Sequence, residues 1–144
     1  MAGVDDDDER FLRRAIELAQ DGIVSGNEPF GSLLVGPDGE VLVESYNTVA
    51  EDRDVSAHPE LKLAVWAARE LTAERAAGTT MYTSCQPCAM CTGALARSGL
   101  GRVVFALSNQ QFAQLVAGET HREPTQDGPY LYDEARAPIE RYYR

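Results

Sequence analysis

The spacing of hydrophobic residues changes from helical to strand-like along the first third of the chain. In residues 10–22 apolar side chains recur every three or four positions and a glycine ends the pattern, which predicts an amphipathic helix. Two short β-rich segments follow at 30–35 and 41–46, and the residues between them, 36–39, supply Gly, Pro and Asp for a turn. We therefore expect an antiparallel hairpin after the first helix.

Helical and strand patterns alternate through the middle of the chain. A polar loop leads to Pro59, which suits the first turn of a helix that runs to Leu71. Residues 79–83 have the pattern of a strand, 87–98 that of a helix, and 102–107 that of another strand. Strand, helix and strand in this order imply a parallel crossover, so the chain is expected to be a single α/β domain over residues 1–144 with helices on both faces of the sheet.

The two ends of the chain are less regular. The acidic residues 1–9 are expected to be a disordered segment or the solvated start of the first helix. At the other end we expect a helix at 109–117, a loop at 118–129 and a terminal helix at 130–143 that is interrupted or bent at Pro138. The tyrosines of this terminal segment either close a site over an aromatic ring or pack at a dimer contact.

Charge and composition limit the choice of partners. The 144 residues carry a net charge of −10 and a single lysine, Lys62. Nucleic acids are bound by clustered Lys and Arg, so a nucleic-acid partner is not expected. No apolar run approaches the length needed to span a membrane, and we expect a cytoplasmic protein that acts on a small molecule.

Two short clusters contain residues that bind metals. Cys88 and Cys91 are three positions apart at the start of a predicted helix, where the helix dipole favours the thiolate form. With His58 they make the three protein ligands of a catalytic zinc site, in which water takes the fourth position. Glu60, two residues after His58, is the expected general base.

These clusters resemble a known signature. His58-Pro59-Glu60 and Pro87-Cys88-Ala89-Met90-Cys91 match the H-x-E and P-C-x-x-C motifs of zinc-dependent nucleobase deaminases, in the cytidine and deoxycytidylate deaminase superfamily. Residues 28–31, Asn47 and residues 83–88 look most like the branch of guanine, cytosine and tRNA adenosine deaminases. The resemblance covers roughly residues 10–107 and implies a three-layer α-β-α fold with a mixed five-stranded sheet, one zinc ion and a homodimer.

The resemblance also implies roles for individual residues. Glu60 transfers the proton, Asn47 binds a polar group of the substrate, Phe30 packs on its ring, and the backbone near Ser84 receives the departing amine. Pro59 departs from the family pattern, because it lacks the backbone N–H that commonly binds the substrate ring. We therefore expect that the substrate has no acceptor there, or that another donor replaces this N–H.

The expected function is hydrolytic deamination of a guanine-like or cytosine-like nucleobase or nucleoside, with release of ammonia. One alternative within the same chemistry is a tRNA-specific adenosine deaminase, which needs a basic surface for the anticodon stem. An alternative of a different class is a closed, non-catalytic zinc site in which Cys85 is the fourth ligand. Glu60 argues against this alternative, since a closed site has no use for a base.

Overall fold

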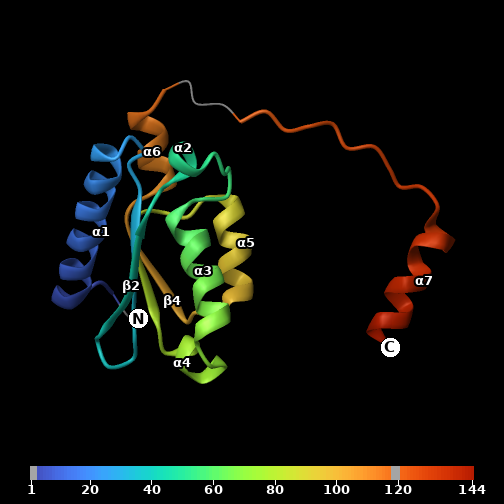
Figure 1. Cartoon of the computed structure of the whole chain (residues 1–144), viewed down its shortest axis with the longest axis horizontal. Helices are drawn as coiled ribbons and strands as arrows, with labels where there is room; N and C mark the ends of the chain where they lie inside the picture. Colours follow the sequence, from blue (N-terminus) through green and yellow to red (C-terminus); the bar gives the residue numbers. More distant parts are fainter. Residues whose placement is uncertain (1–2, 118–120) are drawn as a thin grey trace.

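The computed structural model describes residues 3–117 and 121–144. Within these residues a mixed sheet lies between helices (Figure 1). Its strands are β1 (Gly31–Val35), β2 (Val41–Tyr46), β3 (Thr80–Cys85) and β4 (Arg102–Leu107). The helices are α1 (Asp6–Val24), α2 (Val49–Asp52), α3 (Pro59–Glu70), α4 (Ala73–Ala77), α5 (Ala89–Ser98), α6 (Asn109–Leu115) and α7 (Tyr132–Tyr143).

The strands follow the order β2-β1-β3-β4 in the sheet. β1 is antiparallel to both β2 and β3, whereas β3 and β4 are parallel and are joined through α5. The hairpin and the parallel crossover are therefore confirmed. In the hairpin turn, Gly36 N–H donates to Glu40 O at 2.8 Å, and Gly39 takes a positive φ of 82° that suits glycine.

The α/β class is confirmed, but the expected fifth strand is wrong for the described residues, in which the sheet has four strands. Residues 121–131, which follow α6 after the gap, have no regular secondary structure and form no ladder with β4. The stretch 121–129 contains Pro124 and Pro129, and its one β-branched residue is Thr125, with no Val, Ile, Phe, Tyr or Trp. β4 consequently remains an edge strand.

Two core layers cover the two faces of the sheet, with α1 on one face and α3 and α5 on the other (Figure 1). Neighbouring strand residues alternate between the layers, so the buried strands are apolar on both sides. The layer against α1 consists of Phe11, Leu12, Ala15, Leu18, Leu33, Val35, Tyr82 and Val104. The layer against α3 has at its centre Leu34, Leu63, Ala67 and Met81.

Gly31 permits the close contact between α1 and β1. A Cβ atom at this position would lie 2.4 Å from Ala15 O and 2.5 Å from Ala19 N. Both are backbone atoms of α1 and cannot move aside without displacing the helix. Glycine is therefore required where the chain enters the sheet, directly after Phe30.

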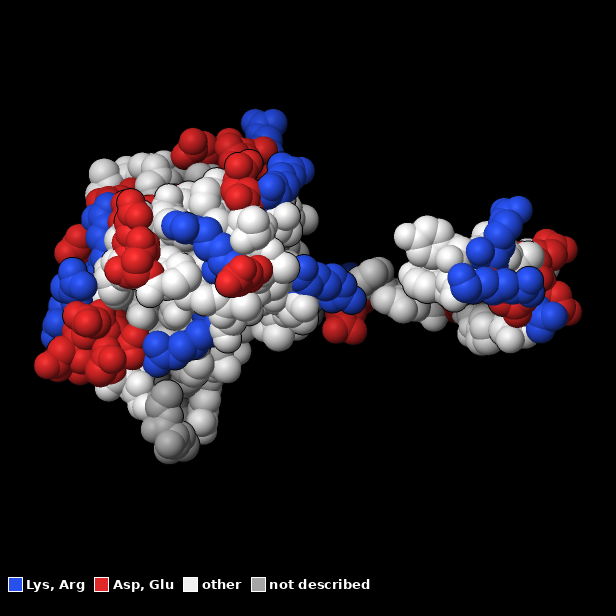
Figure 2. Space-filling model, turned by 90° about the horizontal axis from the view of Figure 1, so that it is seen from below, with Lys and Arg blue, Asp and Glu red and all other residues white. Residues whose placement is uncertain are grey.

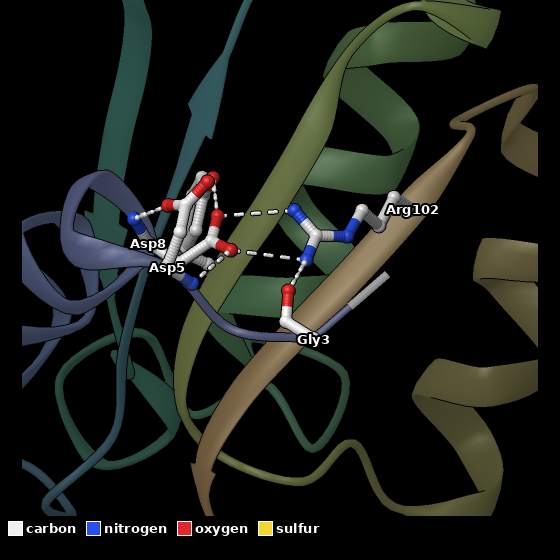
Figure 3. A network of polar contacts seen from close by, with 5 residues as sticks. Gly3, Asp5, Asp8 and Arg102 are labelled. Atoms are coloured by element: carbon white, nitrogen blue, oxygen red, sulfur yellow. Dashed lines mark hydrogen bonds and ion pairs between the residues drawn. The ribbon is translucent and has the colours of Figure 1, made fainter. Parts of the chain in front are cut away.

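The acidic N-terminal segment forms the start of α1 from Asp5 onward. Asp5 is the N-cap of α1 and forms a capping box with Asp8, and the next acidic residues make up the first turn of the helix. Asp8 is buried, and its carboxylate accepts hydrogen bonds from Arg102 and Tyr82 (Figure 3). The expectation of a solvated helix start thus fails at Asp8, while residues 1–2 lie outside the described residues.

Other boundaries differ from the expected ones because of local capping. The helix expected to run to Leu71 ends at Glu70, and Thr72 then caps the separate helix α4 by accepting Arg75 N–H. The loop after β2 contains the short helix α2. Among the described residues, no helix combines the length and the apolar character needed to cross a bilayer.

The C-terminal segment leaves the body of the protein (Figure 1). Every residue from 121 to 144 is exposed, and α7 begins at Tyr132 and includes Pro138. Residues 118–120 of the expected loop lie outside the described residues. Several large apolar side chains of this segment are 58–80% exposed, namely Tyr130, Leu131, Tyr132, Ile139, Tyr142 and Tyr143.

Candidate active site

Two helix N-termini bring His58, Cys88 and Cys91 together. His58 is the N-cap of α3, and Pro59 is the first residue of that helix. Cys88 is the N-cap of α5, and Cys91 lies in its first turn, fully buried. Because α3 and α5 pack against each other, residues separated by 30 positions in the sequence meet at one end of the sheet.

The distances between these side chains fit a zinc ion. His58 Nδ1 lies 3.6 Å from Cys88 Sγ and 3.4 Å from Cys91 Sγ, and the three ligand atoms lie within 4.8 Å of one another. In a tetrahedral zinc site, Zn–S bonds of about 2.3 Å and Zn–N bonds of about 2.0–2.1 Å place nitrogen and sulfur about 3.6 Å apart. The predicted ligands thus have the spacing and the chemistry of a three-residue zinc site.

The protonation of these ligands also favours a cation. Burial lowers the pKa of His58, which keeps the imidazole neutral and able to bind a metal. Burial raises the pKa of Cys91, and the neighbouring Glu60 and Cys88 raise it further. A pair of thiolates at this position therefore needs a positive charge to compensate for burial, and a bound dication supplies it.

Glu60 is a buried carboxyl group beside the metal ligands. It is the second residue of α3 and is only 6% exposed. Burial raises the pKa of Glu60 to about 7, although its own backbone N–H and the Ser32 hydroxyl partly offset this rise. A carboxyl group with a pKa near neutrality can both accept and return a proton.

Glu60 and the metal ligands His58 and Cys88 line one cavity of about 600 Å³. Other walls of the cavity come from residues for which the sequence predicted no role in binding or catalysis, namely Glu28, Val49, Val55, Gln86, Ala89, Met90, Asn109, Phe112, His121 and Glu123. Phe112 projects from α6, and its ring centroid lies 5.9 Å from that of Phe30. An apolar position in the expected helix 109–117 was the only sequence signal for Phe112.

The predicted substrate-binding residues occupy different positions relative to this cavity. Phe30 lines it. Asn47 is buried directly after β2, where its N–H donates to Phe30 O at 2.9 Å, and its Nδ2 has no hydrogen-bond partner among the described residues. Ser84 Oγ accepts the Gly31 N–H at 3.1 Å, and Pro59 is buried in the first turn of α3. Pro59, Asn47 and Ser84 are not among the residues that line the cavity.

Cys85 and Gln86 lie next to the metal ligands but have other contacts. Cys85 lines the cavity, yet it is not part of the described group of potential metal ligands, and burial raises its pKa. Gln86 Oε1 accepts the Asn109 N–H at 2.9 Å. This bond attaches the metal-binding turn to the start of α6, the helix that carries Phe112.

Comparison with known proteins places the chain in a family. The sequence profile of the cytidine and deoxycytidylate deaminase zinc-binding region matches residues 5–107. A probable cytosine deaminase of Schizosaccharomyces pombe is 33% identical, over 89% of this chain and 87% of its own length. A guanine deaminase of Bacillus subtilis is 34% identical, over 92% of this chain and 79% of its own length.

A solved structure and a further relative extend the comparison. The structure of guanine deaminase from Bacillus subtilis superposes with a TM-score of 0.76 and 28% identity, and it covers 93% of this chain and 92% of that protein. A tRNA-specific adenosine deaminase of Aquifex aeolicus is 30% identical, over 76% of this chain and 72% of its own length. The chain belongs to the cytidine and deoxycytidylate deaminase superfamily and is an enzyme that hydrolyses carbon–nitrogen bonds.

Proposed function

We propose that this enzyme is a zinc-dependent hydrolytic deaminase of a small amino-substituted nitrogen heterocycle, either a guanine-like or a cytosine-like nucleobase or nucleoside, and that it releases ammonia. One observation supports this proposal above all others. The carboxyl group of Glu60 is buried in the same cavity as the metal ligands His58 and Cys88. A structural zinc site has no need of such a group.

His58, Cys88 and Cys91 are the residues that hold the metal. When bound, zinc supplies a Lewis acid and lowers the pKa of a water molecule in the position that three protein ligands leave open. The two thiolates balance the charge of the ion. The positive charge also favours the ionised form of the neighbouring Glu60, which must be ionised to accept a proton.

Glu60 moves the protons of the reaction. Its carboxylate accepts a proton from the attacking water and delivers it to a ring nitrogen of the substrate. Glu60 then accepts a second proton, from the hydroxyl group that has been added to the ring carbon, and passes it to the exocyclic nitrogen, which leaves as ammonia while a carbonyl remains on the ring. Burial of Glu60 excludes bulk water, so these transfers occur within the cavity.

Phe30, Asn47 and the backbone near Ser84 are the proposed substrate contacts, and of these Phe30 lines the cavity. The ring of Phe30, supported by Phe112, offers an apolar face for a planar heterocycle. The unpartnered Nδ2 of Asn47 is a donor for a polar group of the substrate. The backbone near Ser84, at the end of β3, is assigned to the departing amine.

The charge of the protein supports a small substrate over tRNA. None of the described residues that line the cavity is Lys or Arg, and Lys62 donates to Tyr46 O and to Thr48 Oγ1. On the face shown in Figure 2, basic side chains are interspersed with acidic ones and form no continuous basic area. Similarity to tRNA adenosine deaminases keeps that activity as the second candidate.

A panel of substrates tests the proposal. Zinc-loaded enzyme is expected to release ammonia from at least one of guanine, cytosine, adenine or their nucleosides. It is not expected to form inosine in tRNA or to shift the mobility of tRNA on a gel. Formation of inosine in tRNA without activity on any free base or nucleoside would instead establish the second candidate.

We also propose that the enzyme is a homodimer to which the C-terminal segment contributes. In a single chain α7 exposes Ile139 and several tyrosines, and a short helix with an unpacked apolar face is marginally stable in water. Exposed apolar patches of this kind mark interaction sites. Burial of this face against a second copy accounts for its composition.

A further inference from the structure

The active-site cavity contains more negative charge than proton transfer requires. Three carboxyl groups line it, Glu28, Glu60 and Glu123, and none of the described lining residues is Lys or Arg. Glu60 is assigned to the proton transfers, and a zinc ion is neutralised by its two thiolates. The other two carboxylates are therefore available to the substrate, and they disfavour a substrate that carries a phosphate.

The loop that carries Glu28 is fixed on both sides of this residue. Asn27, which is buried, donates from Nδ2 to Glu51 Oε1 at 3.1 Å and accepts the Glu51 N–H at 3.1 Å. On the other side, Phe30 O accepts the Asn47 N–H, and the Phe30 ring contacts Phe112. These contacts hold the backbone at Glu28 in place beside the cavity.

The side chain of Glu28 is free to meet a ligand. Among the described residues it has no ion-pair or hydrogen-bond partner, while its backbone oxygen accepts the Phe30 N–H at 2.9 Å. Glu28 and the metal ligand His58 line the same cavity. Glu123 lacks comparable anchoring, because it lies in an irregular segment that is exposed throughout.

From this arrangement we infer that Glu28 determines specificity, and that it selects heterocycles with a second hydrogen-bond donor besides the amino group that is removed. This inference rests on the proposed function. The donor is a second amino group or a protonated ring nitrogen, which gives a charge-assisted hydrogen bond with the carboxylate. A diamino heterocycle is therefore preferred to its monoamino counterpart, and a nucleoside monophosphate is rejected.

The test compares 2,6-diaminopurine with both of its monoamino counterparts, adenine and 2-aminopurine, so that one of them keeps the amino group that is removed and lacks only the other. Cytidine 5′-monophosphate is the phosphate-bearing probe. Binding is measured by calorimetry and turnover by ammonia release, for the native enzyme, Glu28→Gln and Glu28→Ala. Glu40→Gln is the matched control, because Glu40 is exposed in the hairpin turn, at the other end of β1 from Phe30.

The native enzyme is expected to prefer 2,6-diaminopurine by about tenfold or more, the scale of one hydrogen bond to a charged group. Both Glu28 variants should lose most of this preference with little change for the monoamino purine that keeps the removed amino group, and Glu40→Gln should keep the preference. An unchanged preference in the Glu28 variants, or tight binding of the monophosphate, overturns the inference. Binding of 2,6-diaminopurine that depends on Glu28, with no ammonia released from any substrate, supports the inference and contradicts the proposed function. Ammonia release with a substrate preference that does not depend on Glu28 supports the proposed function and contradicts the inference.

Discussion

The carboxylate of Asp8 and the guanidinium of Arg102 form two hydrogen bonds of 3.0 Å, between residues 94 positions apart (Figure 3). The hydroxyl of Tyr82 donates to the same carboxylate at 2.5 Å. The start of α1 is thus attached to β3 and to the edge strand β4. The bonds from Arg102 hold the pKa of Asp8 far below its usual range, even though burial opposes this shift.

Asp8 is therefore expected to make stability depend on pH in acid. The pKa of Asp8 in the folded protein lies below that in the unfolded chain. The contribution of Asp8 to the free energy of unfolding is therefore complete above about pH 4 and is lost as the pH falls further. Asp8→Asn should lower the free energy of unfolding at pH 7, because it removes a buried carboxylate that binds Arg102. The expected loss is only about 1–3 kcal/mol, since Arg102 is partly exposed and solvent screens its charge. Urea unfolding between pH 2.5 and 7 measures both effects. Asp7→Asn is the control, since Asp7 is exposed, and equal pH profiles for the native protein and Asp8→Asn would contradict the assignment.

Elements with strong local signals could be predicted from the sequence, whereas long-range pairings could not. The turn 36–39 and Pro59 fix their surroundings by backbone chemistry alone, and both were located correctly. The burial of Asp8 depends on Arg102, which is distant in the sequence, and no local pattern of acidic residues indicates such a partner. The fifth strand was inferred from family resemblance, and the composition of residues 121–129 gives the physical reason for its absence there.

The same distinction applies to the site. The metal ligands are grouped in two short motifs at helix starts, so residue type and spacing were sufficient to find them. Glu28, Phe112 and Glu123 come from a loop, a helix and the C-terminal segment, and only the fold brings them to one cavity. Their chemistry is ordinary when each is considered alone. Such residues determine which substrate binds, which is why the reaction type could be predicted from the sequence more readily than the substrate.

Replacement of Glu60 by Gln should abolish most turnover while the metal remains bound. The amide has nearly the same shape as the carboxyl group but cannot accept the proton from water. A decrease in kcat of about 10²- to 10⁴-fold is expected from the loss of general acid–base catalysis. Metal content by elemental analysis and kcat by ammonia release are the two measurements. Glu70→Gln, an exposed change at the far end of α3, is the control, and a Glu60→Gln enzyme with native kcat would refute the proposed role.

Cys85→Ser should leave one zinc ion per chain. Cys85 lines the cavity but lies outside the His58, Cys88 and Cys91 group, and burial raises the pKa of its thiol. Zinc content after dialysis distinguishes this open site from a closed site with four protein ligands. Cys88→Ser serves as the positive control, because it removes a ligand. If Cys85→Ser loses zinc as Cys88→Ser does, the catalytic interpretation fails.

Pro59→Ala should alter substrate preference by restoring an N–H group at the first turn of α3. Alanine is tolerated at this helix position, so the fold should be retained. If the substrate lacks an acceptor there, the new donor favours a ring that has one, and the ratio of kcat/KM between cytosine and guanine should change by about tenfold. The ratio of the two kcat/KM values is the appropriate measurement, because a loss of activity that affects both substrates equally leaves it unchanged. An unchanged ratio would mean that this backbone position does not contact the ring.

Ile139→Asp should convert the proposed dimer to a monomer. Ile139 is 58% exposed in the single chain, so its replacement removes no contact from the core of the protomer and should leave the melting temperature of the body unchanged at low concentration. An aspartate in a buried apolar interface, by contrast, has a large desolvation cost. Light scattering coupled to gel filtration is expected to show twice the chain mass for the native protein and for Glu140→Gln, and the chain mass alone for Ile139→Asp. A native monomer would exclude the dimer. A dimer that tolerates Ile139→Asp would show that the partner contact lies elsewhere than on the apolar face of α7.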